Sequence, residues 1–361
     1  MNTFGRLFRI TTFGESHGAG IGVVIDGLPS GITLDLDRVR IALQRRRPGR
    51  LAYTSPRQEA DAAQVLSGLY QGKTIGSPLT LWIPNVDVRS EEYTAVSEAF
   101  RPSHADYTYA LKYGHTDPRG GGRSSARETA ARVAAGAVAQ QFLESRYPQL
   151  RLLVWTAAIG PHMTVRMPLG AEEIEASPVY CPDPEVSQAM IEYLKQLQEE
   201  GDTTGGIVAA RVEGLPAGLG EPLYDKLHAR LGYAMLSINA AKGFEVGEGF
   251  GAARQKGSEH NDPFIRTEDG RIRPATNRAG GVLGGISTGE DLVFRVAFKP
   301  IATLRRPQAT VTRTGMPTTL RVHGRHDPCA LPRAVPVVEA MTAIVLADFV
   351  LLAEVSVMNR H

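Results

Sequence analysis

Residues 14–18 have the sequence GESHG, a stretch in which Ser16 and His17 could do chemistry. The stretch matches the G-x-S-x-G pattern that holds a nucleophilic serine on a sharp turn between a strand and a helix. The segment that follows, AGIGVVIDG, is rich in glycine and β-branched residues and predicts a strand where that geometry needs a helix. The pattern therefore disfavours a serine hydrolase, and a hairpin turn with Ser16 and His17 in solvent is the plain alternative.

Residues 45–50 have the sequence RRRPGR and place four arginines close to the predicted end of a helix. Cations stabilise a helix C-terminus, which alone would explain any one of them. Four neighbouring guanidinium groups repel one another unless an anion holds them, and arginine binds phosphate and carboxylate groups through paired donors. The cluster therefore indicates an anion site, with a solvated helix end as the alternative.

A histidine lies between opposite charges in residues 100–107, FRPSHADY. Pro102 sets a turn in which His104 stands between Arg101 and Asp106. Nearby charges can tune the pKa of a histidine for proton transfer. His104 is therefore a candidate acid or base, and a purely structural histidine is the alternative.

Residues 120–128, GGGRSSARE, place glycines and hydroxyl groups before a strongly helical segment. Ser125 is a natural N-cap, and Glu128 follows at the distance of a capping box. Free N–H groups, the positive end of a helix dipole and a close backbone approach make such a start an anion site. A well-capped helix after a flexible loop would produce the same letters without a ligand.

Two turns nearer the C-terminus carry further charge. KPIAT at residues 299–303 follows a predicted strand and precedes Arg305 and Arg306, while RHDPC at residues 325–329 contains Asp327. Either could be a solvated loop. Because arginines gather beside the glycine-rich loops, the pattern as a whole predicts a small polyanionic ligand, or two, in one enclosed site.

The bulk composition excludes several other classes. The chain has 361 residues, with 40 basic and 38 acidic side chains and a net charge of +2, which disfavours a nucleic-acid binder. Cys181 and Cys329 lie too far apart in sequence for a zinc motif, so we expect no metal and no disulfide framework. No signal peptide and no membrane span are predicted, since the apolar run 335–352 contains Glu339 and Asp348 and indicates a buried helix. The expected location is the cytoplasm.

Strands and helices that position these loops are mixed without strict alternation, repeat or linker. This order predicts one interleaved α+β domain over residues 1–361. Strands are expected at 7–13, 20–26, 79–83, 151–158, 205–212, 291–298 and 319–323. Helices are expected from about residue 35 to Pro48, from Ser125 onward, and at 221–240 and 333–352.

Eight motifs taken together resemble one family. In order they are GESHG, RRRPG, FRPSHADYTY, GGGRSSARET, SINAAKG, GGISTGE, KPIAT and RHDPC. The chain looks like a chorismate synthase from Gly5 to the C-terminal helix. The resemblance implies a single-domain β-α-β sandwich, a homotetramer, and a 1,4-anti elimination that converts 5-enolpyruvylshikimate 3-phosphate to chorismate and phosphate. It also implies reduced FMN, which lends an electron as phosphate leaves. Whether NADPH reduces that flavin on this chain or a separate reductase does so stays open.

The same resemblance assigns roles to residues. His17 resembles the acid that protonates the departing phosphate, and His104 the residue that protonates the reduced flavin. Asp327, helped by Ser16 and Ser125, resembles the group that accepts a proton relayed through the flavin. The implied flavin-binding residues are Arg123, Ser124, Ser125, Asn239, Ala240, Gly284, Lys299, Pro300, Ile301, Ala302, Thr303 and Arg325. The implied substrate clamp is Arg46, Arg47, Arg101, Arg127 and Arg325.

Two positions depart from the family pattern, and two rivals remain. Ser103 stands where glycine is common before the histidine, and Arg50 does not match the usual spacing after RRRPG. The rivals are a serine hydrolase acting through Ser16 and an anion- or RNA-binding module built on the arginine loops. Near-neutral charge argues against the second.

Overall fold

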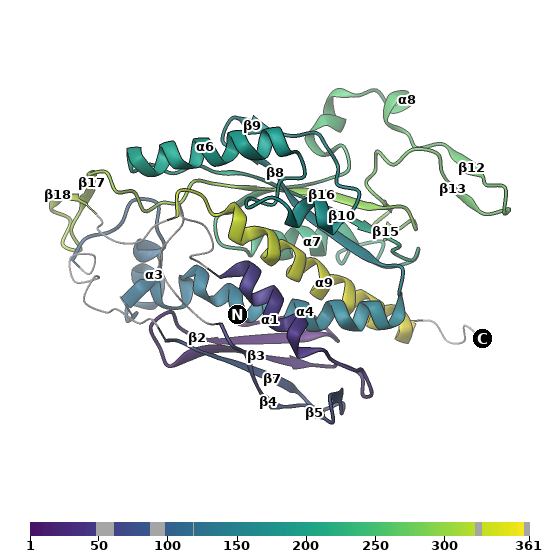
Figure 1. The fold of residues 1–361 in the computed structure, drawn as a ribbon, viewed down its shortest axis with the longest axis horizontal. Helices are drawn as coiled ribbons and strands as arrows, with labels where there is room; N and C mark the ends of the chain where they lie inside the picture. Colours follow the sequence, from purple (N-terminus) through teal and green to yellow (C-terminus); the bar gives the residue numbers. More distant parts are fainter. Residues whose placement is uncertain (48–60, 87–97, 118, 322–326, 357–361) are drawn as a thin grey trace.

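The computed structural model describes residues 1–47, 61–86, 98–117, 119–321 and 327–356, apart from the side chains of residues 119 and 120. Two five-stranded sheets enclose a layer of helices (Figure 1). This arrangement confirms the predicted α+β class and its β-α-β layering.

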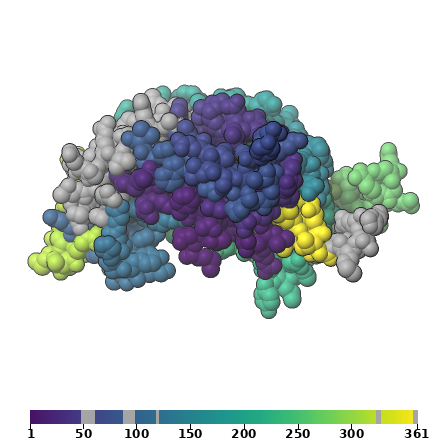
Figure 2. Space-filling model, turned by 90° about the horizontal axis from the view of Figure 1, so that it is seen from below, coloured from purple at the N-terminus to yellow at the C-terminus, as the bar shows by residue number. Residues whose placement is uncertain are grey.

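The first sheet is built from the N-terminal quarter of the chain. Its strands are all antiparallel, in the order β1-β2-β3-β7-β4. They are β1 (Thr3–Phe4), β2 (Arg9–Gly14), β3 (Gly20–Asp26), β7 (Leu79–Pro84) and β4 (Gln64–Ser67). Alternate residues of β7 are buried because one face of this sheet packs on the helices. Viewed from below, N-terminal residues form the centre of the opposite face (Figure 2).

Strand β3 begins directly after the GESHG turn and pairs with β2 in antiparallel fashion, so that Gly14 lies opposite Ile21. The predicted strand is confirmed. GESHG is the connection of a hairpin and lacks the strand-to-helix geometry that a serine hydrolase needs.

The second sheet has the antiparallel order β11-β16-β10-β8-β9. Its strands are β11 (Ala241–Val246), β16 (Leu292–Phe298), β10 (Gly206–Glu213), β8 (Arg151–Ile159) and β9 (His162–Met163). Strands β8, β10 and β16 confirm the predictions at 151–158, 205–212 and 291–298.

The middle layer holds α1 (Leu36–Arg46), α4 (Thr129–Arg146), α7 (Leu227–Leu236) and α9 (Leu331–Ser356). Helices α4 and α9 touch at Gly136, where an added Cβ would lie 2.2 Å from the Cβ of Ala340, so only glycine permits this approach. Helix α9 is long and apolar enough to cross a membrane, but 89% of its most apolar window is buried inside the molecule. Its composition is that of a core helix, as predicted.

Smaller elements lie around this frame. Helix α6 (Pro184–Glu200) lies on the outer side of the second sheet (Figure 1). The hairpins are β5 (Leu69–Tyr70) with β6 (Lys73–Thr74), β12 (Phe264–Arg266) with β13 (Ile272–Pro274), β14 (Val282–Leu283) with β15 (Ile286–Ser287), and β17 (Gln308–Val311) with β18 (Pro317–Leu320). The short helices are α3 (Asp106–Tyr113), η2 (Arg119–Ser124), η3 (Ala126–Glu128), α5 (Ala171–Glu175), η4 (Gly249–Arg254) and α8 (Gly257–His260).

Three predicted boundaries were wrong. The helix expected at 221–240 is limited to α7, because the N–H of Leu227 bonds to the carbonyl of Gly285 and Ala240 has a left-handed φ of 67°. Ser125 caps the single turn η3, and Glu128 pairs with Arg132 instead of closing a capping box, so α4 begins later. The strand expected at 319–323 begins earlier, as β18, and residues 322–323 lie outside the described part.

Helix α6 was not predicted, although Asp183 caps it and Pro184 is its first residue.

Candidate active site

Backbone and side-chain hydrogen bonds join the predicted ligand loops. The N–H of Ser16 donates to the carbonyl of Gly122 over 3.2 Å, which ties the GESHG turn to the GGGRSS loop. The side-chain Nδ2 of Asn239 donates to the carbonyl of Ser124 over 3.0 Å. Three motifs more than a hundred residues apart in sequence therefore meet at the start of η3.

Lys299 links two further loops to this group. Its backbone N–H donates to the carbonyl of Ala240 over 2.9 Å, and its Nζ to the carbonyl of Ser103 over 3.3 Å. Burial and the charge of Lys242 lower the pKa of Lys299. The following turn packs inward, since the carbonyl of Ile301 accepts a bond from Thr203 and Thr303 is buried.

Two buried polar atoms in this region make no hydrogen bond within the described chain. They are Nη1 of Arg123 and Oδ1 of Asn239. The other amino group of Arg123, Nη2, donates to the carbonyl of Thr12 over 2.8 Å, which holds the guanidinium in place. Buried donors and acceptors are costly when unpaired, so a fixed donor and acceptor at converging loops fit a polar ligand such as a flavin.

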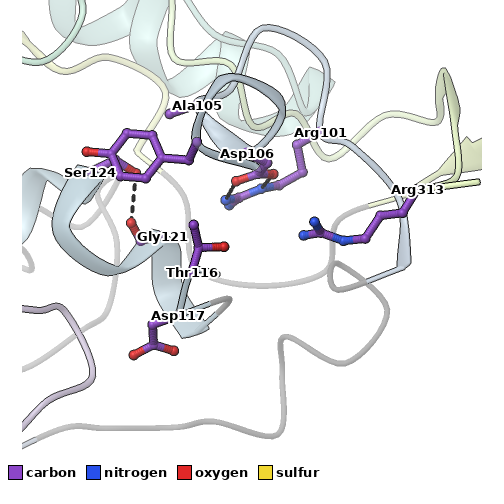
Figure 3. Close-up of a pocket in the computed structure, with 9 residues that line it drawn as sticks. Arg101, Ala105, Asp106, Thr116, Asp117, Gly121, Ser124 and Arg313 are labelled. Atoms are coloured by element: carbon purple, nitrogen blue, oxygen red, sulfur yellow. Dashed lines mark hydrogen bonds and ion pairs between the residues drawn. The ribbon is translucent and has the colours of Figure 1, made fainter. Parts of the chain in front are cut away.

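His104 is held by the charges predicted to tune it. Arg101 makes two bonds to Asp106, of 2.6 Å and 2.5 Å, and the Nδ1 of His104 lies 2.9 Å from Oδ1 of Asp106. Burial alone would raise the pKa of Asp106, but the bonds from Arg101 and His104 outweigh it and lower the pKa well below its usual range. Figure 3 shows Arg101 and Asp106 facing each other in a pocket that Ser124 and Arg313 also line.

Ser103, where the family often has glycine, has a left-handed φ of 57°. Such a conformation is strained for a residue with a Cβ, by about 1 kcal/mol, and more for a β-branched one. We expect Ser103→Gly to leave stability and activity nearly unchanged, because relief of strain offsets the greater freedom of glycine in the unfolded chain. Ser103→Val should lower both. Thermal unfolding of the two variants tests this, and equal melting temperatures would contradict it.

Arg46 and Arg127 share one buried carboxylate. The Nη2 of Arg46 lies 2.6 Å from Oδ2 of Asp61, and Nη1 of Arg127 bonds to Oδ1 of the same residue. All three side chains are almost inaccessible to solvent. Burial raises the pKa of Asp61, but the two guanidinium groups outweigh it and lower the pKa. Burial lowers the pKa of Arg46 to about 10, in spite of Asp61.

Asp327 is buried and accepts a 2.8 Å bond from Nη1 of Arg333. The charge of Arg333 is close enough to help lower the pKa of Arg46. Asp327 therefore lies on the side of the site occupied by the arginines, and it also lines a pocket with Thr303 and Arg305.

Ser16 and His17 are buried, with 2% and 6% of their surfaces exposed, so the alternative of a solvent-facing pair is wrong. Asn85 holds the turn that carries them. Its Nδ2 donates to the carbonyls of Glu15 and Gly18 over 3.0 Å and 2.8 Å, and its Oδ1 accepts a 2.9 Å bond from Nε of Arg127. The side chain of Asn85 thus connects the GESHG turn to the buried group of Arg46, Asp61 and Arg127, which is called the arginine cluster below.

Four further predicted site residues are exposed or half-buried. Arg47 is exposed, and Gly284 occupies an exposed turn between β14 and β15. Strand β15 lies far from α3 (Figure 1). Pro300 is exposed and Ala302 is half-buried. Arg50 and Arg325 lie outside the described residues. Within the described ranges, no group of three or more His, Cys, Asp or Glu side chains could hold a metal ion.

The first two arginines of the RRRPGR stretch are held by carboxylates of the same chain. Arg45 pairs with Glu339 and Glu175, both at 2.7 Å, and its guanidinium stacks on Tyr180. Asp61 and Asn85 were missed at the sequence level because their partners are far away in sequence, and isolated acidic and amide residues carry no local signal.

Comparisons with known proteins agree on one family. A family model described as chorismate synthase matches residues 8–351. The chorismate synthase of Opitutus terrae is 54% identical over 350 residues, 96% of this chain and 96% of that protein. That of Porphyromonas gingivalis is 55% identical over 354 residues, 96% and 95% of the two chains. A solved structure described as a crystal structure of chorismate synthase is similar with a TM-score of 0.77, at 32% identity, and covers 97% of this chain and 93% of its own.

Proposed function

Because this chain belongs to the chorismate synthase family, we propose that its converging loops hold reduced FMN beside 5-enolpyruvylshikimate 3-phosphate. The chain is a lyase that converts this substrate to chorismate and phosphate in the shikimate pathway to aromatic amino acids. We propose in addition the roles of its residues, its oligomeric state, its location and the source of its reducing equivalents.

Reduced FMN, when bound, supplies a reversible source of one electron for the elimination. The observation that carries the proposed site is the pair of unpartnered buried atoms, Nη1 of Arg123 and Oδ1 of Asn239, among the described residues at the junction of the loops. A buried donor and acceptor with fixed directions match a ligand that offers both. The complete proposed set is Arg123, Ser124, Ser125, Asn239, Ala240, Gly284, Lys299, Pro300, Ile301, Ala302, Thr303 and Arg325.

Arginines bind the substrate's phosphate and carboxylate groups. The proposed clamp is Arg46, Arg47, Arg101, Arg127 and Arg325. Buried guanidinium groups that are already fixed, such as those on Asp61, need little reorganisation when an anion arrives, and exclusion of water strengthens each contact.

His17 donates a proton to the departing phosphate, since a poor leaving group needs an acid and histidine titrates near neutral pH. His104 exchanges a proton at Nε2, because its Nδ1 is already in contact with Arg101 and Asp106, each at 2.9 Å. Asp327 accepts a proton, with Ser16 and Ser125 assisting.

We propose further that the whole chain is a single domain that acts in the cytoplasm as a homotetramer. One hydrophobic cluster includes residues of both sheets and of the helices between them, which supports a single domain. NADPH is the proposed source of reducing equivalents, used by this chain or by a separate flavin reductase.

An anaerobic assay tests the function and its cofactor. The protein is mixed with dithionite-reduced FMN and 5-enolpyruvylshikimate 3-phosphate, and phosphate and chorismate are measured. Both products should form in equal amounts, while oxidised FMN should give neither. Equal turnover with oxidised and reduced FMN would contradict the proposed role of the reduced flavin.

A further inference from the structure

We propose that Asn85 is a positioning residue that couples the proton donor His17 to the substrate-binding guanidinium of Arg127. This inference rests on the proposed function, which places those two residues in the reaction. Asn85 itself is assigned no contact with substrate or flavin.

Asn85 lies directly after β7, where it fastens the GESHG turn from one side. Its backbone N–H donates to the carbonyl of Ala19 over 3.1 Å. Its side-chain Nδ2 donates both hydrogens to the turn, one to the carbonyl of Glu15 and one to the carbonyl of Gly18. These two carbonyls flank Ser16 and His17, so the amide closes the turn around the proton donor.

The other atom of the amide faces the arginine cluster. Oδ1 of Asn85 accepts from Nε of Arg127 over 2.9 Å, while Arg127 also donates to Asp61 and, over 3.4 Å, to the carbonyl of Pro84. The guanidinium is planar with fixed donor directions, so three acceptors on three sides determine its position.

The amide can satisfy both neighbours in one orientation only. If Asn85 were turned by half a revolution about its last bond, its oxygen would face two carbonyl oxygens and its NH₂ group would face a guanidinium donor. The presence of Arg127 therefore fixes the donors that hold the His17 turn. The positions of the acid and of the anion-binding group are set by one side chain.

Such coupling matters because, in the proposed function, Arg127 binds an anionic group of the substrate while His17 protonates its departing phosphate. A proton is transferred efficiently only over hydrogen-bond distance, and a misplacement of about 1 Å can cost about a hundredfold in rate. A purely structural tie at Asn85 would stabilise the turn without any dependence on His17. The positioning role and the structural role differ in how the effects on kcat of substitutions at Asn85 and at His17 combine.

A double-mutant cycle distinguishes them. The variants are Asn85→Ala, His17→Ala and the double substitution, assayed anaerobically with reduced FMN and substrate, with kcat and KM determined for each. Asn85→Ala should lower kcat about tenfold or more, the effect expected when hydrogen bonds that orient an acid are lost. In the His17→Ala background the same substitution should change kcat by less than about twofold, because a residue that acts through another has no separate effect.

Asn277→Ala is a matched control, since Nδ2 of Asn277 donates over 2.8 Å to the carbonyl of Asp291, next to the second sheet. It should leave kcat unchanged in both backgrounds. If Asn85→Ala does not fold, Asn85→Asp replaces it. An aspartate keeps the acceptor for Arg127 and loses both donors to the turn, so it should lower kcat and show the same coupling.

The kcat values of the variants distinguish the role of Asn85 from the role of His17. If Asn85→Ala lowers kcat by the same factor with and without His17, Asn85 is structural and the inference fails. If His17→Ala itself leaves kcat unchanged, the proposed role of His17 fails first.

Discussion

His17→Ala is expected to lower kcat by at least about a hundredfold, the usual contribution of a positioned acid, while the protein stays folded. The phosphate that leaves in this reaction needs a proton, and His17 is 6% exposed on a turn fastened to the arginine cluster. Water cannot easily replace a buried donor. Anaerobic turnover with reduced FMN and saturating substrate measures the effect, and circular dichroism checks the fold.

His162→Ala is the matched control for this prediction. His162 packs its ring edge to face against Tyr193 at the end of the second sheet, with 5.4 Å between the ring centroids. Its removal should leave kcat within about twofold of the native value, since no proton is assigned to it. A His17→Ala enzyme with native kcat would exclude His17 as the acid, whereas a loss of kcat in both variants would indicate general destabilisation.

The parts of the fold that follow from local chemistry were predictable. Residues 20–26 contain two glycines and four β-branched side chains and form β3, and Asp35 before an amphipathic segment begins α1. The buried apolar run near the C-terminus forms α9. In each case the residues that determine the element lie within it or beside it.

Elements that depend on distant contacts were harder to predict. The segment before α7 has residues that favour a helix, but a carbonyl from the β14–β15 hairpin takes the N–H of Leu227 and sets where the helix begins. Tertiary hydrogen bonds of this kind outweigh propensities of a few tenths of a kcal/mol per residue. Helix α6 was missed although it has ordinary local signals, the N-cap Asp183 and Pro184 in its first turn. Distant contacts do not explain this omission.

The residues of the candidate site also differ in whether local sequence or distant contacts reveal them. Motifs containing His17, His104 and Arg127 could be recognised, because each combines several functional residues in a short stretch. The groups that hold them could not, since Asp61 and Asn85 become partners of Arg127 only when the first sheet packs on α4. The cluster at 45–50 did indicate anions, but those in contact with Arg45 and Arg46 are the chain's own carboxylates.

Asp61→Ala should lower the free energy of unfolding by about 3–5 kcal/mol. The carboxylate is 1% exposed and lies between Arg46 and Arg127, so its removal leaves two buried cations facing each other without compensation. Asp61→Asn keeps the shape but loses the charge, and its free energy of unfolding should lie between those of Asp61→Ala and the native protein.

The pH dependence of the stability lost in Asp61→Asn shows whether the loss is electrostatic. The folded pKa of Asp61 is lowered below its ordinary value of 3.8, so its ionised form contributes stability above that pH, and the contribution is lost as pH falls through the folded pKa. The deficit of Asp61→Asn relative to the native protein should therefore be largest near neutral pH and shrink as the pH falls below 3.8. Urea unfolding at several pH values measures it.

A surface carboxylate provides the comparison that decides this prediction. Asp26 pairs with Arg9 at 2.5 Å, with 42% and 52% of the two side chains exposed. An exposed pair contributes about 1 kcal/mol or less, so Asp26→Asn should lower stability only slightly. If Asp61→Asn costs no more than Asp26→Asn at neutral pH, Asp61 does not compensate the buried arginines, and the cluster must be held by other groups.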